Sequence, residues 1–397
     1  MPKSHHAGSG TATLTGCGAD PTARLRAVTT TRDMDALAEA LNDTSPDVAR
    51  AAIRRLVDLD PALAAPLLRT VLLDVDLAVT VDLAKALREL DDSETIALAC
   101  AGLVDELYTR RVSAAVTLGV FAEGGVRPDL RRALGDPIAA VRTSALEALS
   151  RVGPDSQSTE QAAELLSDTS AQVRAAAVRL VAGRHPHDGE LLSAMVGDPD
   201  LQVRCELARH LGRLSTDGAR RLLADRDEGV RCQAAGCASA EHTVTLGRLL
   251  TGDSQAEVRR AAARALGGIG GQAAAEELIA GIEDSDAVVR LCVLHALERA
   301  LTRQGAIARL VEEVDAARAR RRRWTLYGLS QLTGHDHDHA TLIWKLADDP
   351  DLDVRLAVLG TASTFLLEPE PLLMYMRTDQ NVEVRESAAR RLEGRSS

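Results

Sequence analysis

The sequence predicts an all-α protein, an α-α superhelix of about twelve stacked helix pairs. Its 397 residues are too many for one compact core, which favours either several domains or a repeat array. Aromatic residues make up only 2% of the chain, so its core must consist mainly of Ala, Leu and Val, which suits helix packing better than a β-sandwich. A pattern recurring every 27 to 34 residues decides for the array.

The repeated pattern is an Asp followed five and six residues later by Val and Arg. DPDLQVR (198–204) and DPDLDVR (349–355) are two nearly identical copies. Only Arg110 and Arg320 replace the Val, and only Ala49 and Thr80 replace the Arg. The Asp occurs twelve times, at positions 43, 74, 105, 136, 168, 198, 225, 253, 284, 315, 349 and 379.

Each period has room for two helices of roughly 10 to 15 residues and two short turns. We expect the repeated Asp to be the N-cap of the second helix, because its carboxylate would accept backbone N–H groups at the positive end of the helix dipole. Pro follows the Asp in three copies, and we expect it at the first helical position. In the segment 171–182, Val173, Ala176, Ala177 and Leu180 fall on one apolar face that packs against neighbouring helices.

On these Asp and Val-Arg positions, the chain resembles the HEAT-repeat proteins, in particular the short bacterial class similar to phycobilisome-lyase HEAT-like repeats. The resemblance covers roughly residues 25–397, and we expect residues 1–24 to form a disordered tail. It implies that the Asp and Arg of adjacent repeats form a structural ladder of hydrogen bonds, since half-buried arginines need acceptors. The implied ladder consists of Asp136, Arg142, Asp168, Arg174, Asp198, Arg204, Asp225, Arg231, Asp253, Arg259, Asp284, Arg290, Asp349, Arg355, Asp379 and Arg385.

The opposite face of the second helices is the predicted binding surface. Positions two and six residues beyond the Val point away from the packed side, and in HEAT solenoids this face lines the concave groove. These 24 positions carry nine cations and two carboxylates, a net charge near +7 in a chain of −11. We therefore expect a basic, partly apolar groove for an acidic protein or peptide or a phosphate-bearing ligand; alternatively, these arginines pair with acidic residues on adjacent turns. The candidate partner-binding residues are Arg50, Arg54, Lys85, Arg179, Arg209, Arg260, Arg264, His295 and Arg322.

Histidine-rich segments are the only candidates for a metal site, and we expect no metal. In GHDHDHA (334–340), only His335 and His339 would converge on one helix face, and a solvated loop is the alternative. His185 and His187 lie in another inter-helix turn, where the same loop interpretation applies. A di-iron hydroxylase of HEAT fold would require His-Glu dipeptides, which the chain lacks.

Two further clusters invite interpretation. The arginines of RARRRRW (318–324) spread around a helix rather than forming one patch, and we expect Trp324 and Tyr327 to pack in the core; a nucleic-acid or phosphate contact is the alternative. Cys232 and Cys237 lie in the two shortest periods, where we expect a bend or a truncated helix. They are small half-buried residues or, together with Cys205, ligand-binding or nucleophilic thiols.

The six cysteines show no CxxC spacing and are expected to be reduced, as in a cytoplasmic protein. LTGC (14–17) matches a lipoprotein cleavage site, but the segment before it lacks the apolar run of a signal peptide. No stretch approaches about 20 apolar residues, so we expect no membrane span.

These observations favour a non-catalytic cytoplasmic scaffold that holds a protein or peptide, without a cofactor. An enzyme or tailoring-enzyme partner acting on a small molecule or peptide, such as a chromophore lyase, is the first alternative. Nucleic-acid binding through the groove is the second alternative. A fold does not confer a function, so the scaffold expectation depends on the resemblance and on finding no convergent catalytic set.

Overall fold

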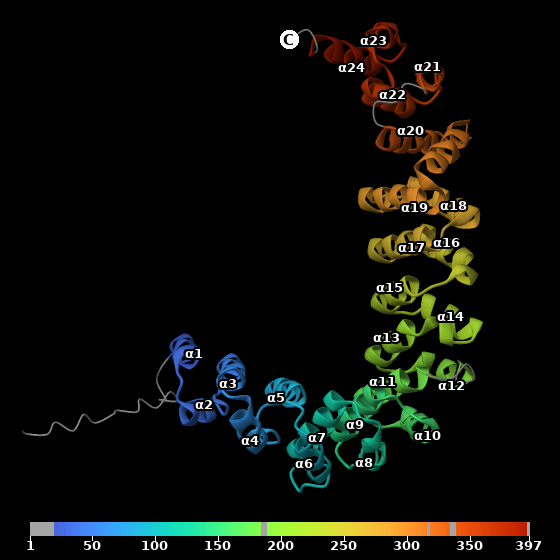
Figure 1. The fold of residues 1–397 in the computed structure, drawn as a ribbon. Coiled ribbons are helices and arrows are strands. Elements are labelled where there is room, and N and C mark those ends of the chain that lie inside the picture. The colour runs from blue at the N-terminus through green and yellow to red at the C-terminus, as the bar shows by residue number, and fades with distance from the viewer. Residues whose placement is uncertain (1–19, 184–188, 316–317, 334–338, 395–397) are drawn as a thin grey trace, which may run out of the picture. The chain divides into compact units, whose positions relative to one another are not determined.

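The computed structural model describes residues 20–183, 189–315, 318–333 and 339–394. These ranges contain 24 α-helices and seven short 3-10 helices, and no strand occurs in them, which confirms the predicted all-α class. The chain divides into two compact units, Met1–Leu207 and Ala208–Ser397, which are described separately (Figure 1). Cys17, His185, His187, His335 and His337 lie outside the described residues.

The first unit contains twelve helices and most of a thirteenth. In chain order they are α1 (Pro21–Thr30), α2 (Met34–Ala40), α3 (Pro46–Leu59), α4 (Pro61–Val71), α5 (Leu77–Glu89), α6 (Glu94–Gly102), α7 (Tyr108–Phe121), η1 (Gly124–Val126), α8 (Arg127–Ala133), α9 (Ala139–Val152), α10 (Ser156–Glu164), η2 (Leu165–Ser167), α11 (Ala171–Ala182), α12 (Gly189–Ala194), η3 (Met195–Gly197) and α13 (Leu201–Arg209).

The second unit continues the same alternation. Its elements are η4 (Leu211–Arg213), α14 (Thr216–Leu223), α15 (Glu228–Gly236), η5 (Ala240–His242), α16 (Thr243–Gly252), α17 (Ala256–Ile269), α18 (Gly271–Ala280), η6 (Gly281–Glu283), α19 (Ala287–Glu312), η7 (Glu313–Asp315), α20 (Ala319–Thr333), α21 (Ala340–Ala347), α22 (Leu352–Phe365), α23 (Glu370–Met376) and α24 (Val382–Glu393).

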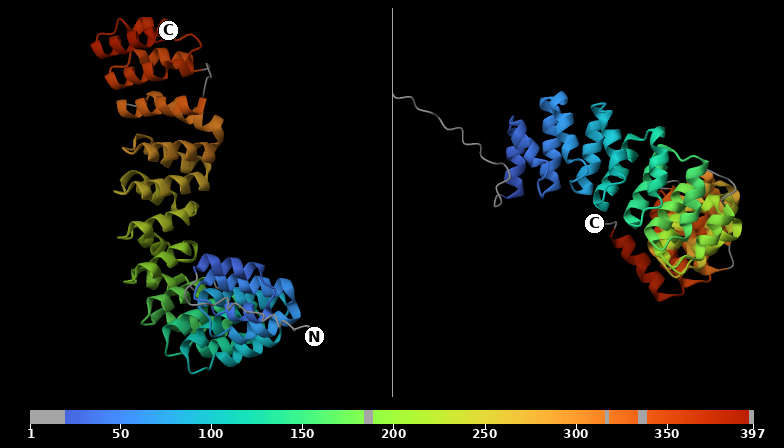
Figure 2. Two further views of the ribbon diagram at one scale, coloured as in Figure 1. Left: turned by 90° about the vertical axis from the view of Figure 1, so that its left-hand side faces the viewer. Right: turned by 90° about the horizontal axis from the view of Figure 1, so that it is seen from below.

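The helices form twelve consecutive pairs in the described part of the chain, from α2/α3 to α23/α24. This count treats α19 as two helices, because Thr302 has φ 72° and ψ 162° and interrupts it. Within each unit the first helices of the pairs form one layer and the second helices another (Figures 1 and 2). The additional helix α1 packs on α3, and because it begins at Pro21, residues 21–24 are helical and do not belong to the expected tail.

Small residues allow neighbouring second helices to approach closely. Helix α11 spans 171–182 as predicted, and Val173, Ala176, Ala177 and Leu180 are all buried, which confirms the apolar face. At Gly267 of α17, an added Cβ would lie 2.8 Å from the Cα of Ala296 in α19. This array therefore depends on backbone contact between helices as well as on Leu and Val packing.

The repeated Asp is not the N-cap, and this prediction was wrong. In the repeat that contains α11, Asp168 accepts the backbone N–H of Ser170 at 2.8 Å, and Ser170 is the N-cap. The carboxylate thus closes the turn just before the helix, where it remains accessible to an arginine of the preceding repeat. The Pro that follows some of these Asp residues also lies before the helix, as Pro199 does before α13.

Candidate functional site

An Asp-Arg ladder runs along the second helices of each unit. In α9, Nη1 of Arg142 donates to the carbonyl of Asp136 at 2.7 Å, and its Nε and Nη2 donate to the carboxylate of Asp168, both at 2.8 Å. The other arginines that bind the carboxylate of the next repeat through Nε and Nη2, within the described parts of the units, form the pairs Arg111–Asp136, Arg174–Asp198, Arg231–Asp253, Arg259–Asp284, Arg322–Asp349 and Arg355–Asp379.

The ladder begins before the first recognised repeat. Nε and Nη2 of Arg24 in α1 donate to the carboxylate of Asp43 at 2.8 and 3.0 Å. Arg204 and Arg385 donate from Nη1 to the carbonyls of Asp198 and Asp379, in the same way as Arg142 does within its own repeat. Asp225 closes the same turn by accepting the backbone N–H of Asp227.

Several of the ladder carboxylates are held in the charged form. Burial raises the pKa of Asp253, but hydrogen bonds from Arg231 and from the Gln255 backbone outweigh burial, so that the pKa lies below its ordinary value. The same balance lowers the pKa of Asp168, Asp198 and Asp349. The rungs are largely buried ion pairs, and loss of one partner would leave a charge uncompensated.

The register of α20 differs by one residue from the predicted one. Arg322, predicted for the groove, instead binds Asp349 in the ladder, and this prediction was wrong. The prediction that Trp324 and Tyr327 pack in the core was also wrong, because Tyr327 is 41% exposed and Trp324 is half-buried. Four consecutive arginines make the register ambiguous in the sequence, and the burial of Leu326 and Leu329 decides it in the structure.

Arg290 of α19 is the second departure from the implied ladder. It donates to the carbonyls of Asp284 and Ser285, but no carboxylate of a described residue accepts from its Nε or Nη2. Its guanidinium carbon instead lies 3.6 Å from the ring centre of Trp324. The prediction of a ladder ion pair at Arg290 was therefore wrong for the part of the chain that the structure describes.

Carboxylates accompany the predicted groove cations of the first unit. Arg50 pairs with Asp82 at 2.7 Å, and Arg179 pairs with Glu206 and Glu147, both at 3.3 Å. Arg54 and Lys85 are exposed and line a hollow of about 240 Å³ together with Arg50, Asp58, Asp82 and Glu89. The sequence prediction counted charges only at the positions two and six residues beyond the Val. It overestimated the positive charge of the face, because Asp82 and Glu206 lie at positions between those two rows.

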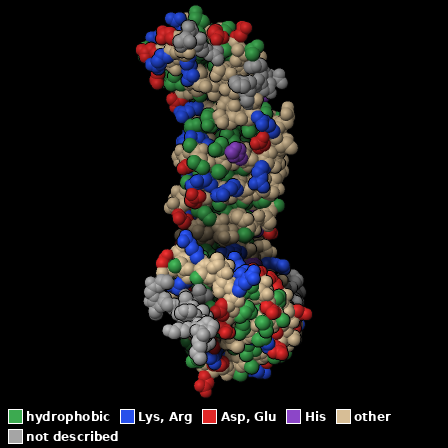
Figure 3. Space-filling model, turned by 60° about the vertical axis from the view of Figure 1, so that its left-hand side comes forward, with side chains coloured by type: hydrophobic (Ala, Val, Ile, Leu, Met, Phe, Trp, Pro, Cys, Tyr) green, Lys and Arg blue, Asp and Glu red, His purple; other side chains and the backbone are tan. Residues whose placement is uncertain are grey.

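The second unit presents the same mixture. Arg260 pairs with Glu257 at 2.5 Å, and Arg264 and His295 are exposed. Arg209, at the end of α13, is also exposed. Basic, acidic and apolar side chains alternate on the face shown in Figure 3. We use the term second-helix face for the exposed and half-buried positions of the second unit that include Cys232, Gly236, Arg260, Arg264, Leu291, His295, Arg323 and Tyr327.

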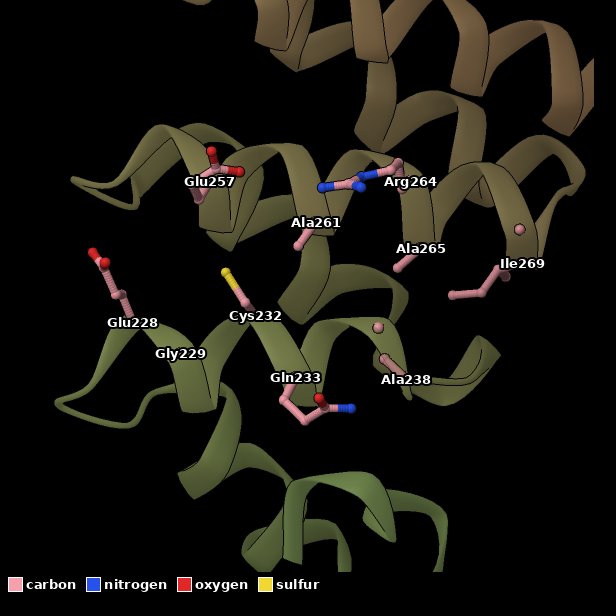
Figure 4. Close-up of a pocket in the computed structure, with 12 residues that line it drawn as sticks. Glu228, Gly229, Cys232, Gln233, Ala238, Glu257, Ala261, Arg264, Ala265 and Ile269 are labelled. Atoms are coloured by element: carbon pink, nitrogen blue, oxygen red, sulfur yellow. The ribbon is translucent and has the colours of Figure 1, made fainter. Parts of the chain in front are cut away.

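A hollow of about 780 Å³ lies on the second-helix face between α15 and α17. Glu228 and Glu257 lie at the end where the two helices begin, and Cys232 points between the helices (Figure 4). Arg264 extends over the middle, and Ile269 closes the far end (Figure 4). We call this the α15–α17 hollow.

Helix length and small side chains create this hollow. Helix α15 has 9 residues and ends at Gly236, whereas α17 has 14, so the last turns of α17 extend beyond the end of α15. An added Cβ at Gly236 or Gly268 would have no heavy atom within 4 Å, which marks open space. Of the bend or truncated helix predicted for the two shortest periods, the structure shows a truncated helix, and the sequence signal was the short period around Gly236.

The described residues that line the α15–α17 hollow provide binding contacts and no activated nucleophile. Burial and the carboxylates of Glu257 and Glu228 raise the pKa of the Cys232 thiol, which keeps it protonated. The described residues contain no group of three or more His, Cys, Asp or Glu that could hold a metal ion. His339, the described member of the weak metal candidate, is the N-cap residue of α21.

Comparison with known proteins shows what these repeats are similar to. The family model for HEAT repeats matches residues 103–182 and 243–330, and no curated protein matches the chain. YibA from E. coli has a TM-score of 0.48 and 22% identity, covering 62% of this chain and 95% of YibA. Yeast importin-β (Kap95p) has a TM-score of 0.48 and 12% identity, covering 94% of this chain and 61% of its own.

An engineered protein, with a TM-score of 0.37 and 18% identity, covers 97% of this chain and 93% of its own. A similarity to phycobilisome-lyase repeats is not shown by these comparisons. No described helix combines the length and apolar composition that crossing a membrane requires. From the matched segments and the twelve helix pairs, we conclude that the chain carries HEAT repeats and that its fold is an α-solenoid of the HEAT type.

Proposed function

We propose that this chain is a non-catalytic scaffold that binds a segment of a partner protein on its second-helix face. The α15–α17 hollow is the observation that carries the proposal. Its volume of about 780 Å³ is in the range of recognition pockets, roughly 300 to 1,000 Å³. Ala261, Ala265 and Ile269 supply an apolar floor, while Glu228 and Arg264 supply polar groups that would orient a bound segment.

The chemistry of the hollow favours binding over catalysis. Cys232 is its one thiol among the described lining residues, and its raised pKa disfavours the thiolate that nucleophilic attack requires. Glu257, the nearest candidate for a base, is engaged by Arg260 at 2.5 Å. A lyase-like or tailoring enzyme remains the alternative class and would be revealed by a small molecule bound to the purified protein.

We further propose that the bound segment is acidic. Several exposed cations of the second helices have no carboxylate partner among the described residues, namely Arg54, Lys85, Arg264 and Arg390. Such cations would attract carboxylates of a partner and favour its acidic stretches over basic ones. Nucleic acid would be attracted by the same cations and is therefore an outcome to be separated by experiment.

The test is affinity capture with the intact chain and two charge-matched double variants. Arg260→Glu/Arg264→Glu alters the second-helix face, and Arg220→Glu/Arg221→Glu changes the net charge equally on α14, a first helix where both residues are exposed. We expect an acidic protein to be recovered by the intact chain and by the α14 variant but lost from the second-helix variant. Quantitative mass spectrometry and a binding assay with the purified partner measure this difference.

Other outcomes would contradict the scaffold proposal. Equal recovery by both variants would move the binding site away from the second-helix face. Recovery of nucleic acid, with an affinity that falls steeply with salt, would indicate phosphate contacts instead. A metabolite or pigment bound to all three proteins would favour the enzyme class.

A further inference from the structure

The ladder has a rung without a carboxylate, at Arg290. Its Nη1 donates to the carbonyls of Asp284 and Ser285 at 2.7 and 3.0 Å, as in the complete rungs, but its Nε is buried without a hydrogen-bond partner among the described residues. The next ladder arginine is Arg322, and six residues before it the sequence has Ala316 where other repeats have Asp. Asp315 pairs with Lys345 at 2.5 Å instead.

An aromatic side chain holds Arg290 in place without occupying its donors. The guanidinium carbon lies 3.6 Å from the ring centre of Trp324, and Tyr327 packs edge-on against Trp324 with ring centres 5.9 Å apart. Stacking uses the face of a guanidinium, whereas its N–H groups point outwards in the plane. Arg290 is therefore positioned beside an exposed aromatic residue with a donor edge that no described carboxylate accepts.

The charge around this edge is positive. The Arg323 guanidinium carbon lies 4.6 Å from the Trp324 ring centre, and its Nη1 donates to Asp353 at 2.8 Å. Arg320 is exposed and has no ion pair with a described residue. Burial lowers the pKa of Arg290, and the charges of Arg323 and Arg320 lower it further against an opposing contribution from Asp284. The guanidinium groups of Arg290, Arg320 and Arg323 thus lie near one another, and Asp353 is the described carboxylate that forms an ion pair with one of them.

We propose that Arg290, assisted by Arg320 and Arg323, binds an Asp or Glu carboxylate of the partner segment, which completes the rung from outside the chain. The inference rests on the scaffold function and names the chemistry of its partner. The complete rungs place a planar carboxylate on the same Nε and Nη2 atoms, so a carboxylate matches the group that the other ladder arginines already bind. Trp324 and Tyr327 provide an apolar surface for the aliphatic part of a glutamate side chain.

Fluorescence of Trp324 in the full chain provides the test. The chain has two Trp residues, so Trp344→Phe leaves Trp324 as the single reporter, and Phe preserves a ring beside Tyr375. The probe is a blocked nine-residue peptide with four Glu around one Leu, and its twin carries Gln in place of Glu. We expect the Glu peptide to change the Trp324 emission in a saturable manner and the Gln peptide to bind at least tenfold more weakly.

Matched variants assign the effect to the donor edge. Arg290→Lys retains the charge but not the two-pronged donor, and we expect at least tenfold weaker binding, whereas Arg299→Lys, an exposed residue of the same helix, leaves binding unchanged. Because Arg290→Lys also alters bonds within its repeat, Arg320→Gln/Arg323→Gln provides a second test that leaves Arg290 intact. We expect severalfold weaker binding for it, with unchanged circular dichroism.

Three results would overturn the carboxylate site: equal binding of the Gln peptide, undiminished binding to Arg290→Lys, or an oligothymidine that binds more tightly than the Glu peptide at the same salt concentration. The scaffold function fails separately. A captured partner that requires Arg260 and Arg264 but is indifferent to Arg290→Lys would preserve the scaffold and remove this site. Peptide binding at Arg290 without any captured partner would preserve the carboxylate site and contradict the scaffold function.

Discussion

Replacement of Gly267 by Ala should destabilise the second unit, and replacement of Gly268 should not. A Cβ at Gly267 would lie 2.8 Å from both the Cα and the Cβ of Ala296 and 3.0 Å from its carbonyl oxygen. Ordinary carbon contacts are about 3.5 to 4.0 Å, so α17 and α19 would have to separate by roughly 1 Å. A Cβ at Gly268, one residue later in the same helix, would meet nothing within 4 Å.

Both variants gain helix propensity, and only one of them introduces a steric clash. Each replaces Gly by Ala in a helix, which stabilises by up to about 1 kcal/mol. Only Gly267→Ala adds overpacking, which costs about 1 to 3 kcal/mol, so the free energies of unfolding should differ by about that amount. Urea unfolding followed by circular dichroism measures the difference, and amide hydrogen exchange should locate it in α17 and α19. Equal stability of the two variants would refute the close helix contact.

Two further predictions concern titrating groups. Because the pKa values of the ladder carboxylates of Asp168, Asp198, Asp253 and Asp349 lie below the ordinary value, near 3.9, their stabilisation should be complete above about pH 5 and be lost as the pH falls through 3.9 towards their folded values. The melting temperature should therefore fall in acid and Asp253→Asn should weaken this dependence; a melting temperature that is constant down to about pH 3 would contradict it. Cys232 should be alkylated by iodoacetamide more slowly than glutathione at pH 7.5, and faster in Glu257→Gln; because the chain has six cysteines, mass spectrometry of the peptide that contains Cys232 measures the rate, and a rate above that of glutathione would contradict the raised pKa.

Periodicity predicted the architecture because every repeat must bury the same face. The Asp and Val-Arg spacing located the twelve pairs and the limits of α11. It did not reveal that Asp168 accepts the backbone N–H of Ser170 rather than capping the helix, since both roles require the same residue type near a helix start. It also missed Arg24, because the residues at 18 and 23 are Gly and Ala instead of the expected Asp and Val.

The candidate sites were less predictable because they depend on packing between repeats. From the sequence, any of the arginines at 320–323 fits the ladder, and only the burial of Leu326 and Leu329 selects Arg322. The short periods around Gly236 predicted a bend or a truncated helix, but the α15–α17 hollow also requires the longer α17 beside α15. Counting charges on two rows missed Asp82 and Glu206, which lie between the rows and bind Arg50 and Arg179.

The incomplete rung also bears on how the second unit unfolds. In a repeat array, stability is approximately a sum of terms within repeats and between nearest neighbours. A complete rung joins one repeat to the next, whereas Arg290 contributes no such bond to a described carboxylate in the following repeat. Within the second unit, cooperativity should therefore be weakest between the repeat that ends near Thr302 of α19 and the repeat that contains α20, so that these two repeats open separately. A ligand that completed the rung would couple their unfolding and stabilise the folded array.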